Sequence, residues 1–192
     1  MNTANKLTIL RVALVPFFAF FLLYGQTDDY LFRFIALIIF LAAAFTDFLD
    51  GYIARKYNQI TDFGKLADPL ADKFLVCAAL IALCSMNELA AWVVIIIVCR
   101  EFLITGMRQL ALENGRNVIA ASVWGKLKTI LQIAMLSSLL LGMGNGSLYT
   151  PLSAYDAPWS VYAANALIIL TVAATVISAA DYIYAYVRTN GK

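Results

Sequence analysis

The chain has 192 residues, of which 62% are hydrophobic and 14% charged, and its net charge is +2. Because soluble domains are about half apolar, this composition indicates a membrane protein, and so small a net charge does not suggest a nucleic-acid partner. The sequence contains no histidine, which excludes the usual zinc ligand and every serine or cysteine nucleophile that histidine activates.

Six apolar segments along the chain predict six transmembrane helices, and we expect them to form a single all-α domain over residues 1–192. In chain order the segments are Leu7–Tyr24, Leu31–Arg55, Leu66–Cys84, Leu89–Leu112, Val123–Met143 and Pro158–Tyr186. A membrane-spanning helix needs about 20 residues, and the shorter apolar runs reach that length only with their charged flanks. No small-residue cleavage site follows the first segment, so we interpret it as a retained span.

The basic residues predict how these spans are oriented. When the N-terminus is placed in the cytoplasm and the spans alternate, all of the 14 basic residues except Arg33 lie on the inner side. We therefore expect a multi-pass protein of the inner (cytoplasmic) membrane with both termini in the cytoplasm. Charged residues within lipid must be paired or hydrated, so the charges at the inner ends of the spans predict a polar cavity that opens to the cytosol.

The inner ends of the second and third spans carry four aspartates with helical spacing. Asp47 and Asp50 lie three residues apart, and Asp68 and Asp72 lie four residues apart, so each pair shares one helix face. Carboxylates gathered at one place repel one another unless cations lie between them. Oxygen ligands without histidine favour Mg²⁺ or Mn²⁺, and two such ions are a recurring arrangement for phosphoryl displacement. The spacing alone leaves a second interpretation open, in which the acids cap helix ends in a solvated loop.

The full string around these aspartates resembles a known signature. It reads D-x2-D-G-x2-A-R-x8-G-x3-D-x3-D, with fixed positions at Asp47, Asp50, Gly51, Ala54, Arg55, Gly64, Asp68 and Asp72. Every element of the CDP-alcohol phosphotransferase signature is present at its expected spacing. The resemblance extends along the chain, because "NKLTILRVALVPFF" is similar to this family's N-terminal opening and "SAADYIYAY" to its last helix. The strings "CREFLITGMRQLALENG" and "WGKLKT" are similar to the bacterial phosphatidylglycerophosphate synthases within the family.

The resemblance implies a fold, a reaction and a set of site residues. Members of the family have six transmembrane helices, are usually dimeric, and transfer the phosphatidyl group of CDP-diacylglycerol to an alcohol with release of CMP. The metal ligands implied by the resemblance are Asp47, Asp50, Asp68 and Asp72. Asp72 is also the implied catalytic base. The implied contacts to CDP-diacylglycerol are Asn5, Thr8, Gly51, Arg55, Thr61 and Gly64.

A second group of charges lies in the fourth and fifth spans: Arg100, Arg108 and Lys126. Arg100 and Arg108 are eight residues apart, which is about two helical turns, so they share one face. Beside the carboxylates they indicate capture of an anionic acceptor, and the resemblance implies sn-glycerol 3-phosphate. The alternative is that such cations only mark the cytosolic boundary, which is our interpretation of Lys128 and Arg116. Glu101 is expected to be a structural ion-pair partner of Arg100.

Other functions are compatible with these features. The same chemistry could use a different acceptor, namely an inositol phosphate, serine or phosphatidylglycerol. A divalent-cation transporter would also need acidic residues within the membrane. Transporters, however, place the ion site near the midplane, often between repeats, whereas the outer halves of these spans are apolar and no repeat is visible.

Overall fold

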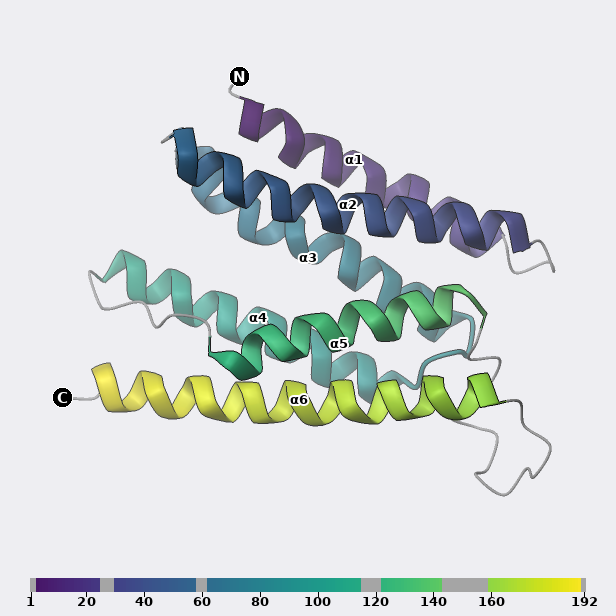
Figure 1. The fold of residues 1–192 in the computed structure, drawn as a ribbon. Helices are drawn as coiled ribbons and strands as arrows, with labels where there is room; N and C mark the ends of the chain where they lie inside the picture. The colour runs from purple at the N-terminus through teal and green to yellow at the C-terminus, as the bar shows by residue number, and fades with distance from the viewer. Residues whose placement is uncertain (1–2, 25–29, 58–61, 115–121, 143–158, 191–192) are drawn as a thin grey trace. The chain divides into compact units, whose positions relative to one another are not determined.

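The computed structural model describes residues 3–24, 30–57, 62–114, 122–142 and 159–190, without the side chains of residues 3–11, 30, 47–57, 62–72 and 190. Within these ranges the chain forms six helices and no strand (Figure 1). The helices are α1 (Thr3–Tyr24), α2 (Tyr30–Tyr57), α3 (Asp62–Ser85), α4 (Ala91–Glu113), α5 (Val123–Leu140) and α6 (Trp159–Asn190). The prediction of an all-α chain is confirmed for the described residues, and each predicted segment overlaps one helix.

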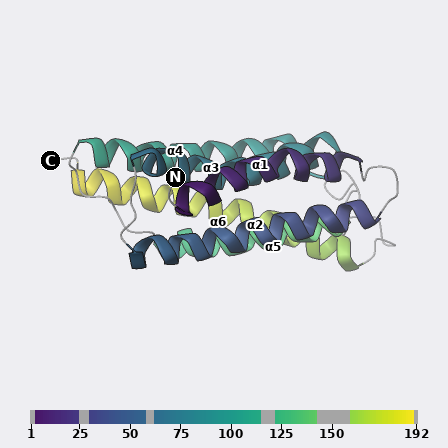
Figure 2. The same cartoon turned by 90° about the horizontal axis from the view of Figure 1, so that it is seen from above.

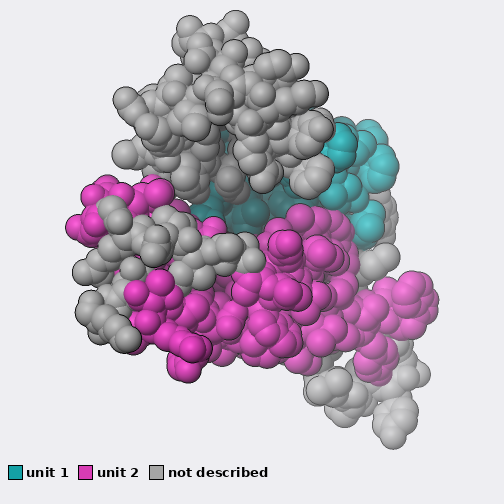
Figure 3. All heavy atoms as spheres, turned by 60° about the vertical axis from the view of Figure 1, so that its left-hand side comes forward, with its two compact units in different colours: residues 1–86, 140–142 teal, residues 87–139, 143–192 magenta. Residues whose placement is uncertain are grey.

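The chain divides into two compact units (Figure 3). Unit 1 comprises residues 1–86 and 140–142, and unit 2 comprises residues 87–139 and 143–192. Unit 1 therefore contains α1, α2 and α3, and unit 2 contains α4, most of α5, and α6. The single domain expected over residues 1–192 stays a prediction.

In unit 1, α1 packs along both α2 and α3 (Figures 1 and 2). Phe18 of α1 lies against Phe40 of α2 with ring centroids 6.1 Å apart, and both side chains are buried. The buried apolar side chains of α3 include Leu75, Ala79, Leu80 and Leu83. Because α1 contacts both neighbours, the three helices that carry the aspartate signature and the N-terminal candidate residues belong to one folded unit.

In unit 2, α4 and α6 pack side by side. Arg100 contacts Ser178 and Arg108 contacts Tyr182, so the residue numbers rise together and the two helices run in the same direction. An ion pair between α4 and α5 joins the third helix to them. The buried apolar residues of this unit include Val93, Ile97, Ile104, Met135, Leu136, Ala164 and Ile168.

Local hydrogen bonds determine where α4 ends and α5 begins. The backbone N–H and the side-chain amide of Asn114 both donate to the carbonyl oxygen of Leu110, at 3.1 and 2.8 Å, and close the last turn of α4. Ser122 precedes α5, and its hydroxyl accepts a hydrogen bond from the Gly125 N–H at 3.3 Å, as an N-terminal cap does. Arg108 lies in the last two turns before the end of α4, and Lys126 and Lys128 lie in the first two turns of α5.

Large apolar side chains are exposed on all six helices. Phe17, Phe45, Ile81, Ile95, Ile130 and Ile169, one from each helix, are all at least 60% exposed. Soluble monomers rarely expose extended apolar surface, so this pattern agrees with a lipid environment. Among the described residues, one helical stretch, Trp159–Thr189, is long and apolar enough to cross a membrane, and three shorter apolar stretches are Val12–Tyr24, Leu31–Thr46 and Lys73–Ser85.

Candidate active site

The predicted carboxylate site falls on two helices of unit 1. Asp47 and Asp50 belong to the continuous helix α2, and Asp68 and Asp72 belong to α3. The backbone is helical through both pairs, which is the condition for residues three or four apart to share a face. The side chains of these four aspartates lie outside the described residues. The same holds for Asn5, Thr8, Gly51, Arg55 and Gly64, and Thr61 lies outside the described residues altogether.

The donor types at these positions suit a hard divalent cation. Carboxylate oxygens are preferred ligands of Mg²⁺ and Mn²⁺, and the chain has no histidine that would favour zinc. The described side chains contain no group of three or more potential metal ligands, but the four aspartates are not among them. Their role as metal ligands therefore stays a prediction that rests on spacing, donor chemistry and the helical backbone.

Arg100 and Arg108 both extend from α4 to α6 and so lie on one face of α4, as their spacing predicts. Arg100 Nη2 donates a hydrogen bond to the Ser178 hydroxyl at 2.7 Å. The Arg108 guanidinium lies over the ring of Tyr182, with its carbon 5.4 Å from the ring centroid, a cation–π arrangement. Ser178 and Tyr182 are four residues apart and share a face of α6. The expectation that the two arginines share one face of α4 is confirmed.

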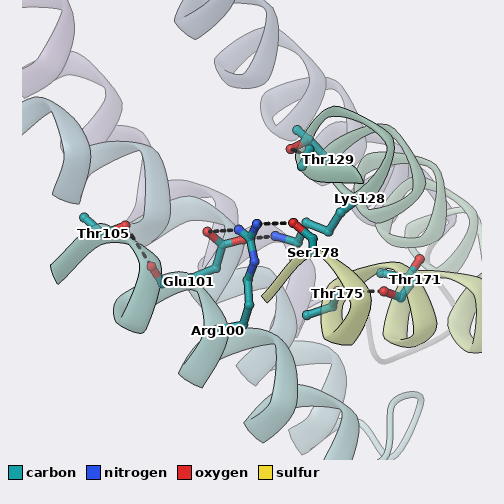
Figure 4. A network of polar contacts seen from close by, with 9 residues as sticks. Arg100, Glu101, Thr105, Lys128, Thr129, Thr171, Thr175 and Ser178 are labelled. Atoms are coloured by element: carbon teal, nitrogen blue, oxygen red, sulfur yellow. Dashed lines mark hydrogen bonds and ion pairs between the residues drawn. The ribbon is translucent and has the colours of Figure 1, made fainter. Parts of the chain in front are cut away.

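Glu101 and Lys128 connect Arg100 to α5 (Figure 4). The Lys128 ammonium forms an ion pair with Oε1 of Glu101. On the other side of the same carboxylate, Oε2 lies 3.7 Å from Arg100 Nη1. The Lys128 side chain is 2% exposed and the Glu101 side chain 11%. We call the group that surrounds these contacts the basic cluster, and its members are Arg100, Glu101, Arg108, Lys128, Ser178 and Tyr182.

The cluster confirms one expectation and overturns another. The expected ion pair between Glu101 and Arg100 is present. The interpretation of Lys128 as a boundary residue is wrong, because its side chain is buried and paired inside unit 2. Lys126, the predicted third phosphate ligand, is exposed, and Arg116 lies outside the described residues.

A signal for Lys128 does exist in the sequence. Glu101 follows a long apolar run in α4, and a carboxylate in such a helix needs a cation partner. Arg100 precedes it by one residue, and consecutive residues of a helix point about 100° apart. Arg100 alone therefore does not satisfy the carboxylate, and a cation from a neighbouring helix is required.

Three buried polar atoms of the cluster make no hydrogen bond to the residues that the structure describes: Arg100 Nε, Arg108 Nε and the Tyr182 hydroxyl. Leaving such donors unsatisfied is costly. The cluster also holds more cations than carboxylates, because Glu101 is the one acid in the set defined above. This excess of positive charge, together with the partly exposed Arg100 side chain, can attract an anion such as a phosphate monoester.

Comparisons with known proteins agree with these features. A family model described as CDP-alcohol phosphatidyltransferase matches residues 1–181. The chain is 44% identical over 149 residues to the CDP-diacylglycerol–glycerol-3-phosphate 3-phosphatidyltransferase of Bacillus subtilis, over 73% of this chain and 77% of that protein. It is 38% identical over 190 residues to a probable phosphatidylglycerophosphate synthase of Mycobacterium tuberculosis, over 99% of this chain and 84% of that protein. A Haemophilus influenzae protein with the same name as the Bacillus one is 43% identical over 150 residues, or 75% of this chain and 78% of its own.

Proposed function

The chain belongs to the CDP-alcohol phosphatidyltransferase family, and we propose that it transfers the phosphatidyl group of CDP-diacylglycerol to sn-glycerol 3-phosphate. The products are phosphatidylglycerophosphate and CMP, so the chain is an enzyme of phospholipid biosynthesis. The observation that carries the proposal is the family match over residues 1–181, which includes both the aspartate signature and the arginines of α4. The names of the relatives at 38–44% identity support glycerol 3-phosphate as the acceptor.

The basic cluster supports an acceptor that carries a phosphate. A phosphate monoester has about 1.5 to 2 negative charges at pH 7. Within the cluster the charges of Arg100, Arg108 and Lys128 exceed that of the one carboxylate by two, which is close to the charge of such a phosphate. We assign the phosphate contacts to the two arginines, with Lys126 as a further cation near the start of α5.

The reaction requires an activated hydroxyl and a stabilised leaving group. We assign Asp72 as the base that takes the proton from the acceptor hydroxyl. The hydroxyl oxygen then attacks the phosphorus that bears diacylglycerol, the bond from this phosphorus to the bridging oxygen breaks, and CMP leaves with the electron pair. Two Mg²⁺ or Mn²⁺ ions would neutralise the pyrophosphate and the departing CMP, and the residues that would hold them are Asp47, Asp50, Asp68 and Asp72.

The CDP part of the donor is assigned to positions on the helices of unit 1 and the segment between α2 and α3. These positions are Asn5, Thr8, Gly51, Arg55, Thr61 and Gly64. An arginine supplies a charged fork for phosphate oxygens, and glycines allow a ligand to approach the backbone closely. The donor contacts and the acceptor contacts are therefore proposed for different helices.

We also propose that the six helices are transmembrane spans of the inner membrane, with both termini in the cytoplasm. The shortest helix, α5, has 18 residues and the longest, α6, has 32, and about 20 residues cross a bilayer. With alternating spans, the end of α2, the start of α3, the end of α4 and the start of α5 lie at the cytosolic side. A polar cavity on that side would admit a water-soluble acceptor to a lipid donor, and a homodimer is the expected assembly.

Purified protein is expected to release CMP from CDP-diacylglycerol when glycerol 3-phosphate is supplied. Each charge-assisted contact to the phosphate contributes about 1.5–3 kcal/mol, so free glycerol should be poorer by at least about tenfold in kcat/KM. The measurement is CMP release in mixed micelles with glycerol 3-phosphate, glycerol, serine, an inositol phosphate and phosphatidylglycerol. If another acceptor outcompetes glycerol 3-phosphate, the acceptor assignment is wrong. Metal flux in proteoliposomes without CMP release would support a transporter instead.

Chelation of divalent ions is expected to stop the reaction. In excess EDTA, CMP release should fall below about a tenth of its value, because the pyrophosphate charge is then uncompensated. Added Mg²⁺ or Mn²⁺ should restore activity, whereas Zn²⁺ should restore it poorly, since the predicted ligands are oxygen atoms without imidazole or thiolate. Full activity in chelator would contradict a metal-dependent mechanism.

A further inference from the structure

Lys128 and Glu101 form a buried ion pair that the proposed reaction does not use directly. The two side chains are 2% and 11% exposed. Removing two charges from water is costly, and replacing such a pair by apolar side chains of similar volume is often neutral or stabilising. A contribution to stability is therefore a weak explanation for the pair. Its neighbours indicate a different role.

Glu101 lies between two cations from different helices. Lys128 of α5 pairs with Oε1, whereas Arg100 Nη1 of α4 lies 3.7 Å from Oε2. A charge-assisted hydrogen bond between a guanidinium and a carboxylate measures about 2.7–2.9 Å, so Arg100 is attracted by Glu101 without the short contacts of a bidentate pair. Arg100 Nη2 is fixed on the Ser178 hydroxyl of α6 at 2.7 Å. Glu101 and Ser178 therefore orient the Arg100 guanidinium, and Glu101 does so without a short bidentate contact.

We propose that the Glu101–Lys128 pair is a positioning element that orients Arg100 and keeps its guanidinium available for the phosphate of the acceptor. Lys128 holds the carboxylate toward α5, and Ser178 holds the guanidinium toward α6 (Figure 4). The Arg100 side chain is 14% exposed, so part of the guanidinium can be reached by an anion. The inference rests on the proposed function, because it takes Arg100 as a ligand of the acceptor phosphate.

Loss of Lys128 should allow Glu101 to compete with the phosphate. In Lys128→Met the carboxylate loses the Lys128 ammonium, so its attraction for the Arg100 guanidinium is no longer shared with a second cation. The KM and the Kd for glycerol 3-phosphate should then rise about tenfold, while the KM for CDP-diacylglycerol changes by less than about twofold. In the double variant Glu101→Gln, Lys128→Met the competing charge is absent, so both acceptor constants should return to within about threefold of the wild type.

Kinetics and binding measure this effect separately. CMP release at varied glycerol 3-phosphate gives the KM, and equilibrium binding of the radiolabelled compound gives the Kd. Glu113→Gln removes an exposed carboxylate from the same helix and is the matched control, with no change expected. Melting temperatures in detergent show whether each variant folds. Ser178→Ala removes only the hydroxyl that orients Arg100 and should raise the KM by about threefold, with recovery in Ser178→Thr.

Two results would overturn the inference. The first is an unchanged glycerol 3-phosphate affinity in Lys128→Met, and the second is a double variant with no lower KM than the single variant. A pair that acts only on stability would lower the melting temperature without this recovery. Failure of the wild type to release CMP with glycerol 3-phosphate would instead contradict the proposed function. Binding of inorganic phosphate to the wild type and to Lys128→Met would then still decide whether Lys128 controls anion affinity, and equal affinities would overturn the inference.

Discussion

Asparagine in place of Asp47, Asp50 or Asp68 is expected to abolish CMP release and leave a folded membrane protein. Asparagine has nearly the same size as aspartate but lacks the charge that a divalent ion requires. Ions at phosphoryl-transfer sites contribute several kcal/mol of charge stabilisation, which corresponds to at least about a hundredfold in rate. The measurement is the initial rate of CMP release at the Mg²⁺ concentration that just saturates the wild type. A variant that retains more than about a tenth of the wild-type rate would exclude its aspartate as a required metal ligand.

Asp72→Asn should be at least as severe, because it removes the proposed base in addition to a ligand. Raised Mg²⁺ or Mn²⁺ should partly restore a variant that only lost metal affinity, and it should not restore one that lost the base. The matched control is Glu113→Gln, which removes an exposed carboxylate outside the signature and should retain full activity. Size-exclusion profiles and melting temperatures in detergent show that the inactive variants are folded.

The helices could be predicted because long apolar runs are separated by polar turns, but hydropathy predicts the apolar part of a helix and not its ends. Residues Thr3–Lys6 extend α1 before the predicted start at Leu7, and α6 continues to Asn190 beyond the predicted Tyr186. In both places the backbone remains helical where the side chains become polar. In contrast, α5 ends at Leu140, before the predicted Met143. Gly142 has a φ of +74° there, a conformation that glycine adopts readily and that ends a helix.

The site was predictable where it depended on spacing within one helix. The eight-residue interval between Arg100 and Arg108 places both on the face of α4 that meets α6, and the structure confirms this contact. The position of Lys128 depends instead on which face of α5 meets α4. Lys126 and Lys128 are two residues apart and point about 200° away from each other on a helix. Only tertiary packing determines that Lys128 is buried against Glu101 while Lys126 is exposed.

Alanine in place of Arg100 is expected to raise the KM for glycerol 3-phosphate by about 10- to 150-fold. The range follows from the loss of one charge-assisted contact of about 1.5–3 kcal/mol. The KM for CDP-diacylglycerol should change by less than about threefold, because that substrate is assigned to Arg55 and the metal ions. Arg100→Lys should fall between Arg100→Ala and the wild type, since lysine keeps the charge but lacks the planar fork that binds phosphate oxygens in pairs.

Comparing the KM for glycerol 3-phosphate with the KM for CDP-diacylglycerol separates the proposed role of Arg100 from that of Arg55 and the metal ions. Both KM values can be measured in one detergent preparation. If the Arg100→Ala variant loses affinity for CDP-diacylglycerol instead, the phosphate contact is wrongly assigned although the family is unchanged. Arg100 also has structural contacts that its replacement could disturb, because it shares Glu101 with Lys128 and donates a hydrogen bond to Ser178. Removal of the guanidinium leaves the Glu101–Lys128 pair intact, so Arg100→Ala should remain folded and its defect should be confined to the acceptor. A defect in Arg100→Ala that vanishes at saturating glycerol 3-phosphate identifies lost binding, whereas a lower kcat at saturation would indicate a contact made in the transition state.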